Sequence, residues 1–348
     1  MLKLFNLGEM PGLDSVTVFH ALARLGIESI VVASPQDPIV SVGYFENVDE
    51  SVDLNFCREH GISVMRREIG GGTTYLDQNQ VFYELILRKG NPIIPIRIID
   101  RYRLFSKPPL ETYRRFGVEA AFRPISDLCT KEGRKIAGEA GGDIGECVVF
   151  AGGILLDFDY RTASGIIRCP DQTFRKMLYK SMKNNLTSMR QELGKAPRKQ
   201  EVESVLIEEY DRLLNPLQPA RLTPVVRDAM TQLEEELTSP RSIAKKSVSP
   251  RMQVKIAEGV SIVQRLGMGA GGLIRITMEV KNNTLADIAI AADCVSPLEN
   301  KLHDLERALT GLKLERGALK RVLDGFYIEH SIKSPQVMPE DLLDTMLG

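Results

Sequence analysis

A stretch rich in serine, proline and basic residues divides this chain into two unequal parts. The segment SPRSIAKKSVSPR, residues 239–251, has little apolar content, which is typical of an exposed linker. The chain has 348 residues, more than one hydrophobic core usually organises. We therefore expect a domain over residues 1–240, a linker over 241–251, a smaller domain over 252–330 and a C-terminal tail over 331–348.

The composition excludes several classes of protein. It is 43% hydrophobic and 26% charged with a net charge of −1, which argues against disorder and against a generally basic nucleic-acid-binding surface. The five cysteines form no Cys-x-x-Cys pair, so neither a disulfide framework nor a zinc site is indicated. No segment has the length expected of a signal peptide or a membrane span. We expect a cytoplasmic monomer that binds no nucleic acid and no membrane.

Helix and strand signals alternate over the first 170 residues, and the remainder is helical before the linker. Residues 13–26 predict a helix closed by Gly26, and residues 118–140 predict two strands joined by a tight turn at Glu132-Gly133. Thr223-Pro224 predicts a helix start. After the linker we expect strands, a capping box at Ser296–Glu299 and a leucine stripe that forms core.

Two glycine clusters invite a ligand-binding interpretation. GMGAGG, residues 267–272, fits the dinucleotide pattern, but a strand-like segment follows it, so a turn entering a strand is favoured. RREIGGG, residues 66–72, is different because positive charge accompanies the glycines. Bare backbone there can approach a phosphate or carboxylate closely, and Arg67 could add a cationic fork. A glycine-rich hairpin with two surface arginines is the equal alternative. Only one of the two arginines should face the site, because strand residues alternate.

A second segment, GRKIAGEAGG at 133–142, places Lys135 among small and apolar residues. Such a lysine either extends to solvent or is held in a pocket, where its ammonium could bridge two oxyanions. Asp127 precedes it across the expected turn and could pair with Lys135 or hold Mg²⁺.

RREIGGGTTYLD followed by GRKIAGEA resembles the lipoate–protein ligases of the biotin/lipoate ligase superfamily, and the likeness extends over nearly the whole chain. It implies an α+β fold: a catalytic domain of mixed β-sheets packed with helices, plus a small α+β accessory domain. It also implies a two-step reaction, in which lipoate and ATP form lipoyl-AMP and an acceptor lysine then takes the lipoyl group.

The resemblance implies roles for individual residues. Lys135 is the expected catalytic residue. The expected lipoate and lipoyl-AMP contacts are Arg67, Gly70, Gly71, Gly72, Thr73, Thr74, Tyr75, Gly138, Ala140 and Gly153. The expected ATP and magnesium contacts are Asp77, Gln80, Asp127 and Lys135, with Asp127 as the Mg²⁺ ligand. The implied partner is a lipoyl-acceptor protein: a dehydrogenase lipoyl domain, a glycine-cleavage H protein or a specialised lipoate-binding protein.

The chain departs from the family pattern at several positions. Leu76 stands where a histidine is common, Ser126 replaces an asparagine, and Gln80 stands where the ligases have asparagine. These departures leave room for altered substrate contacts or a different acceptor.

Three alternatives remain open. TTYLDQNQ is also similar to a stretch of the ATP-independent octanoyl transferases, which use a cysteine thioester; Cys169 or Cys129 would then be the nucleophile. Cys57, Cys147 and Cys294 have no catalytic context, and we interpret all five cysteines as structural. A non-catalytic acyl-binding homologue is the second alternative. Biotin ligase is the third and weaker one, because its signature is absent.

Overall fold

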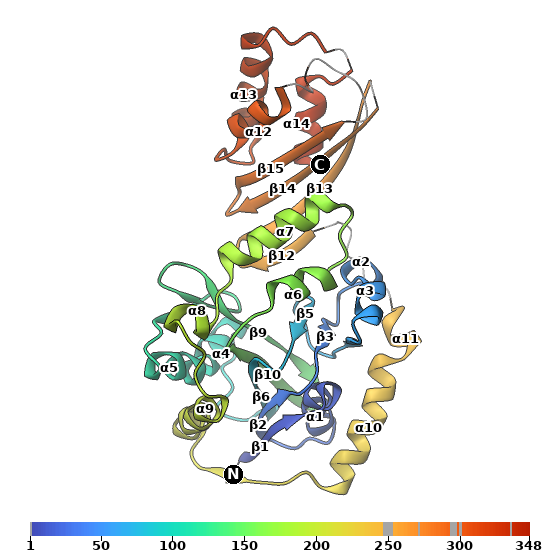
Figure 1. Ribbon diagram of the computed structural model, residues 1–348. Helices are drawn as coiled ribbons and strands as arrows, with labels where there is room; N and C mark the ends of the chain where they lie inside the picture. Colours follow the sequence, from blue (N-terminus) through green and yellow to red (C-terminus); the bar gives the residue numbers. More distant parts are fainter. Residues whose placement is uncertain (1, 246–252, 271, 293–297, 299–300, 335) are drawn as a thin grey trace. The chain divides into compact units, whose positions relative to one another are not determined.

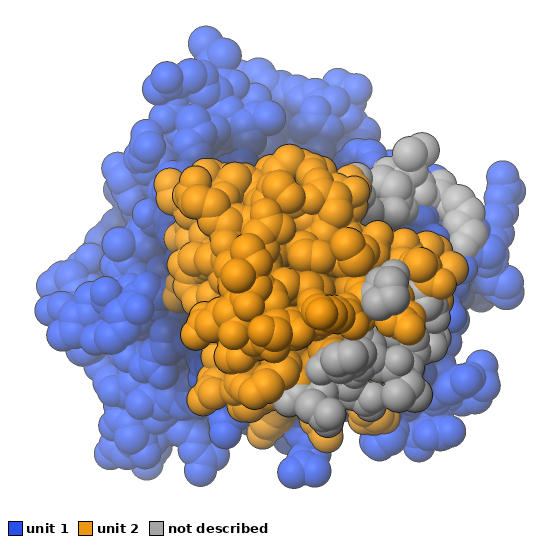
Figure 2. Space-filling model, turned by 90° about the horizontal axis from the view of Figure 1, so that it is seen from above, with its two compact units in different colours: residues 1–168, 183–249 blue, residues 169–182, 250–348 orange. Residues whose placement is uncertain are grey.

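The structure is a computed structural model, and it describes residues 2–245, 253–270, 272–292, 298, 301–334 and 336–348. Its contacts divide the chain into two compact units, which Figure 2 colours separately. Unit 1 comprises residues 1–168 and 183–249, and unit 2 comprises 169–182 and 250–348. The division differs from the expected one at two places. Residues 169–182 belong to unit 2, and residues 331–348 are part of its fold rather than a tail.

Unit 1 contains most of the elements labelled in Figure 1. Its strands are β1 (Leu2–Met10), β2 (Ser29–Pro35), β3 (Ile39–Val42), β4 (Ser63–Arg66), β5 (Thr74–Leu76), β6 (Gln80–Arg88), β7 (Ala120–Arg123), β8 (Asp127–Thr130), β9 (Lys135–Ile144), β10 (Cys147–Leu155) and β11 (Leu217–Pro219). Its helices are α1 (Gly12–Arg24), α2 (Val48–Ser51), α3 (Leu54–Glu59), α4 (Ile98–Phe105), α5 (Lys107–Arg115), α6 (Tyr160–Ile166), α8 (Met189–Leu193), α9 (Lys199–Leu214), α10 (Pro224–Thr238) and α11 (Pro240–Ile243).

An eight-stranded mixed sheet is the framework of unit 1, in the order β11-β1-β2-β6-β10-β9-β8-β7. The strands β11, β1 and β2 are parallel, and each following pair is antiparallel. A three-stranded sheet, β4-β3-β5, accompanies it. These are the mixed sheets packed with helices that the sequence predicts.

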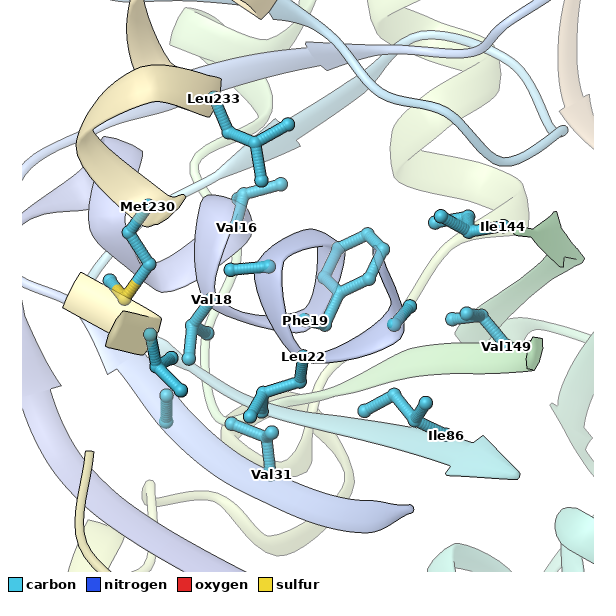
Figure 3. Packing of buried hydrophobic residues seen from close by; sticks show 14 of the residues in the cluster. Val16, Val18, Phe19, Leu22, Val31, Ile86, Ile144, Val149, Met230 and Leu233 are labelled. Atoms are coloured by element: carbon cyan, nitrogen blue, oxygen red, sulfur yellow. The ribbon is translucent and has the colours of Figure 1, made fainter. Parts of the chain in front are cut away.

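Helices cover both faces of the large sheet. On one face, α1 packs onto the sheet and α10 packs onto α1, and Figure 3 shows Phe19 and Leu22 of α1 against Val31 and Ile86. Nearly all of α1 is buried because the sheet lies on one side of it and α10 on the other. On the other face, side chains of α4, α5 and α9 build a second core around Tyr83 of β6. Each fully buried valine, leucine, isoleucine, phenylalanine or methionine in these two cores stabilises the fold by roughly 1.5–3 kcal/mol relative to an exposed side chain.

Local sequence signals explain the element ends in unit 1. Gly26 adopts a φ of +66° after α1, and Gly133 has a φ of +78° in the turn before β9, so both predicted turns are confirmed. Thr223 is the N-cap residue of α10 with Pro224 in the first turn, also as predicted. Pro197 directly precedes Arg198, the N-cap residue of α9, and the helix begins at Lys199.

Unit 2 is a small α+β domain in which a four-stranded antiparallel sheet packs against helices. Its elements are β12 (Gln253–Ala257), β13 (Val260–Gly269), β14 (Gly272–Lys281), β15 (Thr284–Ala292), α12 (Leu302–Leu309), α13 (Arg316–Glu329) and α14 (Pro339–Leu347). Most of α7 (Gln172–Asn185) also belongs to it. Leu342, Leu343 and Met346 of α14 are fully buried in its core, which is why residues 331–348 are not a tail.

The second glycine cluster is a hairpin, as predicted. Gly267 and Gly269 lie at the end of β13, and Gly272 begins β14, with Gly267 opposite Ile274. The predicted leucine stripe is core, since Leu305 and Leu309 are fully buried. The helix itself begins only at Leu302, and the predicted capping box at Ser296–Glu299 lies mostly outside the described residues. Among the described residues, none of the helices combines the length and the apolar character needed to cross a bilayer.

Candidate functional site

The triple glycine forms a turn that lies against β9 on the large sheet. The amide of Gly70 donates to the carbonyl of Gly141 at 3.3 Å, and Gly71 has a φ of +92°. A Cβ atom at Gly43 would lie 1.7 Å from the carbonyl oxygen of Gly71, so the two backbones pass closer than side chains allow. Glycine is therefore required here by packing and by backbone conformation together.

Arg67 holds this turn from inside. Its guanidinium donates to the carbonyls of Gly70 at 2.8 Å, Gly72 at 2.7 Å and Ser41 at 2.7 Å. The side chain is 5% exposed, and burial lowers the pKa of Arg67 to about 10. The expected ligand-binding fork is thus engaged with the turn's own backbone. Because a trans peptide points N–H opposite to C=O, the amides of Gly71 and Thr73 are directed away from Arg67.

The neighbouring arginine has other partners. Arg66 donates to the carbonyls of Ser242 and Lys245, both at 2.8 Å, and to that of Tyr44 at 3.0 Å. It therefore secures α11 and the residues directly after it, whereas Arg67 secures the glycine turn. The alternation of the two side chains along the strand is as predicted, although both are buried rather than lying on the surface.

Lys135 begins β9, and its ammonium is held on the sheet by a buried carboxylate. Its Nζ lies 2.8 Å from Oδ1 of Asp127, which is only 1% exposed, while the lysine side chain is 23% exposed. Arg123 approaches the other oxygen of Asp127 at 3.5 Å. A Cβ atom on Gly138, which pairs with Asp127, would lie 2.8 Å from Nζ. The lysine side chain thus lies across Gly138. Asp127 neutralises its ammonium group from one side, and the other side of the ammonium is accessible.

The same strand brings Lys135 and the glycine turn onto one surface. An ideal Cβ at Gly71 would lie 3.5 Å from Cβ of Ala140, so the turn lies beside Ala140. Ala140 pairs with Ala151 of β10, and both alanines are half-buried. Thr73 adds a hydroxyl that is buried without a hydrogen-bond partner among the described residues. Such an orphaned polar atom beside directed amides fits a polar ligand at this turn.

The remaining predicted binding residues form a compact turn around β5. Thr74 donates its hydroxyl to Ser41 O at 3.0 Å, and Gln80 donates to Tyr75 O at 3.2 Å. Asp77 accepts from the Asn79 amide at 2.9 Å, and burial raises the pKa of its carboxyl. These contacts order the chain between β5 and β6. The side-chain groups that make them are bound to this protein's own backbone and not directed at a nucleotide. Burial, followed by the nearby Asp77 charge, also raises the pKa of Tyr75.

Gly153 lies two residues beyond Ala151 on β10, and because β10 and β9 are antiparallel, this direction leads along β9 from Ala140 toward Gly138 and Lys135. It pairs with Phe82, and a Cβ at this position would lie 3.3 Å from the Phe82 ring and 3.8 Å from Oε1 of Gln80. It therefore lies at the Lys135 end of the surface and also borders Gln80 at the start of β6.

Asp127 does not fit the expected role of magnesium ligand. Its oxygens face the cations of Lys135 and Arg123, and the side chain is buried. Within the described part of the chain, no group of three or more His, Cys, Asp or Glu side chains is arranged to hold a metal ion. Asp127 is instead suited to position the lysine, and we assign no step to a metal at this residue.

The three cysteines of unit 1 do not present an activated thiolate near Lys135. Burial raises the pKa of the Cys129 thiol to about 11, despite the opposing influence of Arg123. Burial likewise raises the pKa of Cys57 to about 11 and that of Cys147. Cys169 is half-buried and belongs to unit 2, and Cys294 lies outside the described residues.

Two buried glutamates were missed by the sequence reasoning. Glu139 lies within reach of the Tyr83 hydroxyl at 3.1 Å and of Ser106 Oγ at 2.6 Å, and burial raises its pKa to about 8. Glu84 is buried in the middle of β6. The available signal was an acidic residue placed between apolar or small residues inside each strand.

Comparison with family models identifies the class of protein. Residues 16–211 match the lipoyl protein ligase A/B catalytic domain, and residues 265–346 match the bacterial lipoate protein ligase C-terminus. The first match covers more than half of the chain. The chain belongs to the lipoyl protein ligase A/B family.

Individual relatives come from both branches of the family. The chain is 26% identical to octanoyltransferase LipM of Geobacillus kaustophilus over 219 residues, 56% of this chain and 78% of that protein. It is 23% identical to lipoate–protein ligase 2 of Staphylococcus aureus over 300 residues, 82% of this chain and 81% of that protein.

A solved structure shares the fold. It is a bipartite lipoate protein ligase from Thermoplasma acidophilum, described with its E2 lipoyl domain. The TM-score is 0.63 at 22% identity, covering 72% of this chain and all of that one.

Proposed function

We propose that this protein is an ATP-dependent lipoate–protein ligase, which activates lipoate as lipoyl-AMP and transfers the lipoyl group to a lysine of a lipoyl-acceptor protein. The observation that carries the proposal is the second unit, since residues 265–346 match the C-terminal domain of bacterial lipoate ligases. The relative with the wider alignment, over 300 residues, is also named a ligase.

The arrangement around Lys135 suits the first chemical step. The lipoate carboxylate attacks the α-phosphorus of ATP, and pyrophosphate leaves, so two anionic groups must approach each other. The accessible side of the Lys135 ammonium contacts both and neutralises charge that develops in the transition state. Asp127 holds the ammonium in place, and Gly138 leaves room for it.

The second step requires no nucleophile from this chain. The ε-amine of the acceptor lysine attacks the acyl carbonyl of lipoyl-AMP, an amide forms, and AMP leaves with the electron pair of the broken bond. The Gly71 and Thr73 amides, directed away from Arg67, hold the anionic end of the adenylate. The acceptor is a lipoyl domain or a protein of similar kind.

An ATP-independent octanoyl transferase is the second candidate, favoured by the relatives named octanoyltransferase LipM. It requires a thiolate nucleophile, and the raised pKa of Cys129 disfavours that residue. Cys169 is then the remaining cysteine with a proposed catalytic role.

One assay separates the two candidates. Purified protein is incubated with a lipoyl domain and either lipoate or octanoate, with and without Mg-ATP, and also with octanoyl acyl-carrier protein. The ligase requires ATP, forms acyl-AMP and keeps its activity in Cys169→Ala. Transfer from the acyl-carrier protein without ATP, abolished by Cys169→Ala, would establish the transferase instead.

A further inference from the structure

Glu84 carries a carboxyl group that is buried in the large sheet of unit 1. It lies in the middle of β6 and is 4% exposed, and its Oε2 has no hydrogen-bond partner among the residues that the structure describes. Burial raises its pKa well above the usual range of a glutamate, which favours the protonated, neutral form. An unpaired buried polar group of this kind destabilises a fold. Its presence therefore needs an explanation, and a role in function is one.

The direction of this side chain follows from the alternation along β6. Val81, Tyr83, Leu85 and Leu87 all pack in the core built with α5 and α9. Glu84 therefore points to the opposite face, which it shares with Ile86. That is the face on which α1 packs, and it also carries Ala140 beside the glycine turn.

A row of small residues connects Glu84 with the glycine turn. In register across three strands, Glu84 lies opposite Ala151, and Ala151 lies opposite Ala140. Both alanines are half-buried, whereas Val149, two residues from Ala151, is 1% exposed. The small side chains of this row are thus partly exposed, although they also pack against the core on this face. Two strand spacings separate Glu84 from Ala140, roughly 10 Å, which is comparable to the length of an eight-carbon acyl chain.

We propose that Glu84 determines acyl-chain specificity by donating a hydrogen bond to a sulfur atom at the far end of the bound chain, so that lipoyl is preferred over octanoyl. This inference rests on the proposed function for the position of the carboxylate end. That end lies at the glycine turn and Lys135, and the chain runs over Ala140 and Ala151 to Glu84.

The physical reason is the cost of leaving the carboxyl unpaired. An octanoyl chain ends in a methyl group and offers this buried carboxyl no acceptor. A dithiolane sulfur is a weak acceptor, but it satisfies the O–H that octanoyl leaves orphaned. A site that contains a buried polar group discriminates strongly against ligands that cannot pair with it.

The test is calorimetric titration of the full chain with lipoate and, separately, with octanoate. Wild type is expected to bind lipoate about tenfold more tightly than octanoate. Glu84→Leu should remove this preference, mainly by improving octanoate binding, and Glu84→Gln should keep most of it because the amide still donates. Glu203→Leu is the matched control, since Glu203 is also a buried carboxyl with an unpaired Oε1 among the described residues but lies on α9.

The outcomes distinguish two failures. If wild type and Glu84→Leu bind both acids with the same ratio of affinities, Glu84 does not set specificity, while the ligase proposal stands. If wild type binds neither acid, the proposed function fails and this inference with it. Circular dichroism of each variant confirms that it is folded.

Discussion

The Nζ atom of Lys135 lies 2.8 Å from Oδ1 of Asp127, with Lys135 partly accessible and Asp127 buried. The pair joins the first residue of β9 to the first residue of β8, and Gly138 lies beneath the ammonium. A buried carboxylate that orients an accessible cation is an arrangement suited to catalysis, because the charge is placed before substrate arrives.

We expect Asp127→Asn to reduce lipoyl transfer by about tenfold to a hundredfold, because the lysine loses the charge that orients it. Lipoate binding should change little, so the effect should appear in kcat. The measurement is steady-state transfer to a lipoyl domain. Asp143→Asn is the control: Asp143 lies on β9, the strand of Lys135, but its ion pair with Lys89 is exposed. Equal activity of both variants would contradict a positioning role.

Gly138→Ala tests the space beneath the ammonium. A Cβ there would lie 2.8 Å from Nζ of Lys135, so the lysine must move although no charge is removed. Transfer activity should fall at least about tenfold, while thermal stability remains close to that of wild type. Gly325→Ala serves for comparison, because a Cβ on this α13 residue meets no atom within 4 Å. Full activity of Gly138→Ala would show that the position of Nζ is not critical.

Arg67→Lys tests whether the glycine turn depends on a guanidinium. Lysine cannot reach the carbonyls of Gly70, Gly72 and Ser41 together, and buried acceptors left unpaired cost about 1–3 kcal/mol each. We expect urea unfolding to show a loss of roughly 2–4 kcal/mol. Arg24→Lys should lose less than about 1 kcal/mol, because Arg24 bridges carboxylates at the surface. A similar loss in both variants would argue against the special role of Arg67.

His20 predicts an acid-sensitive contribution to stability. It is fully buried, its Nε2 accepts from the Glu68 amide at 3.0 Å, and burial lowers its pKa from 6.5 to about 3. In the folded state His20 stays neutral at pH values at which the imidazole of the unfolded chain is already protonated. The contribution is therefore complete above pH 6.5 and is lost as pH falls toward 3, by at most about 1.4 kcal/mol per pH unit.

The measurement is the free energy of unfolding of wild type and His20→Gln between pH 7.5 and 4. The difference between the two proteins should shrink as pH falls, since glutamine does not titrate. A difference that is constant with pH would exclude His20 as the titrating group.

The sequence by itself determined much of the fold, because its signals are local. Gly26 and Gly133 end a helix and form a turn through backbone conformation alone, and Thr223-Pro224 begins a helix in the same way. The family resemblance, carried by the arginine–glycine and lysine segments, identified the ligase family that the matched models also show.

Tertiary structure decided what each charged residue contacts. Arg67 was expected to bind ligand, yet its guanidinium donates to the carbonyls of Ser41 and of the glycine turn. Only folding brings these carbonyls together around the guanidinium. Asp127 was expected to hold a metal, but strand pairing places it against Lys135. Residues 331–348 carry an apolar face whose burial depends on the sheet of unit 2. Partners distant in sequence leave no local signal, so the structure alone could assign these contacts.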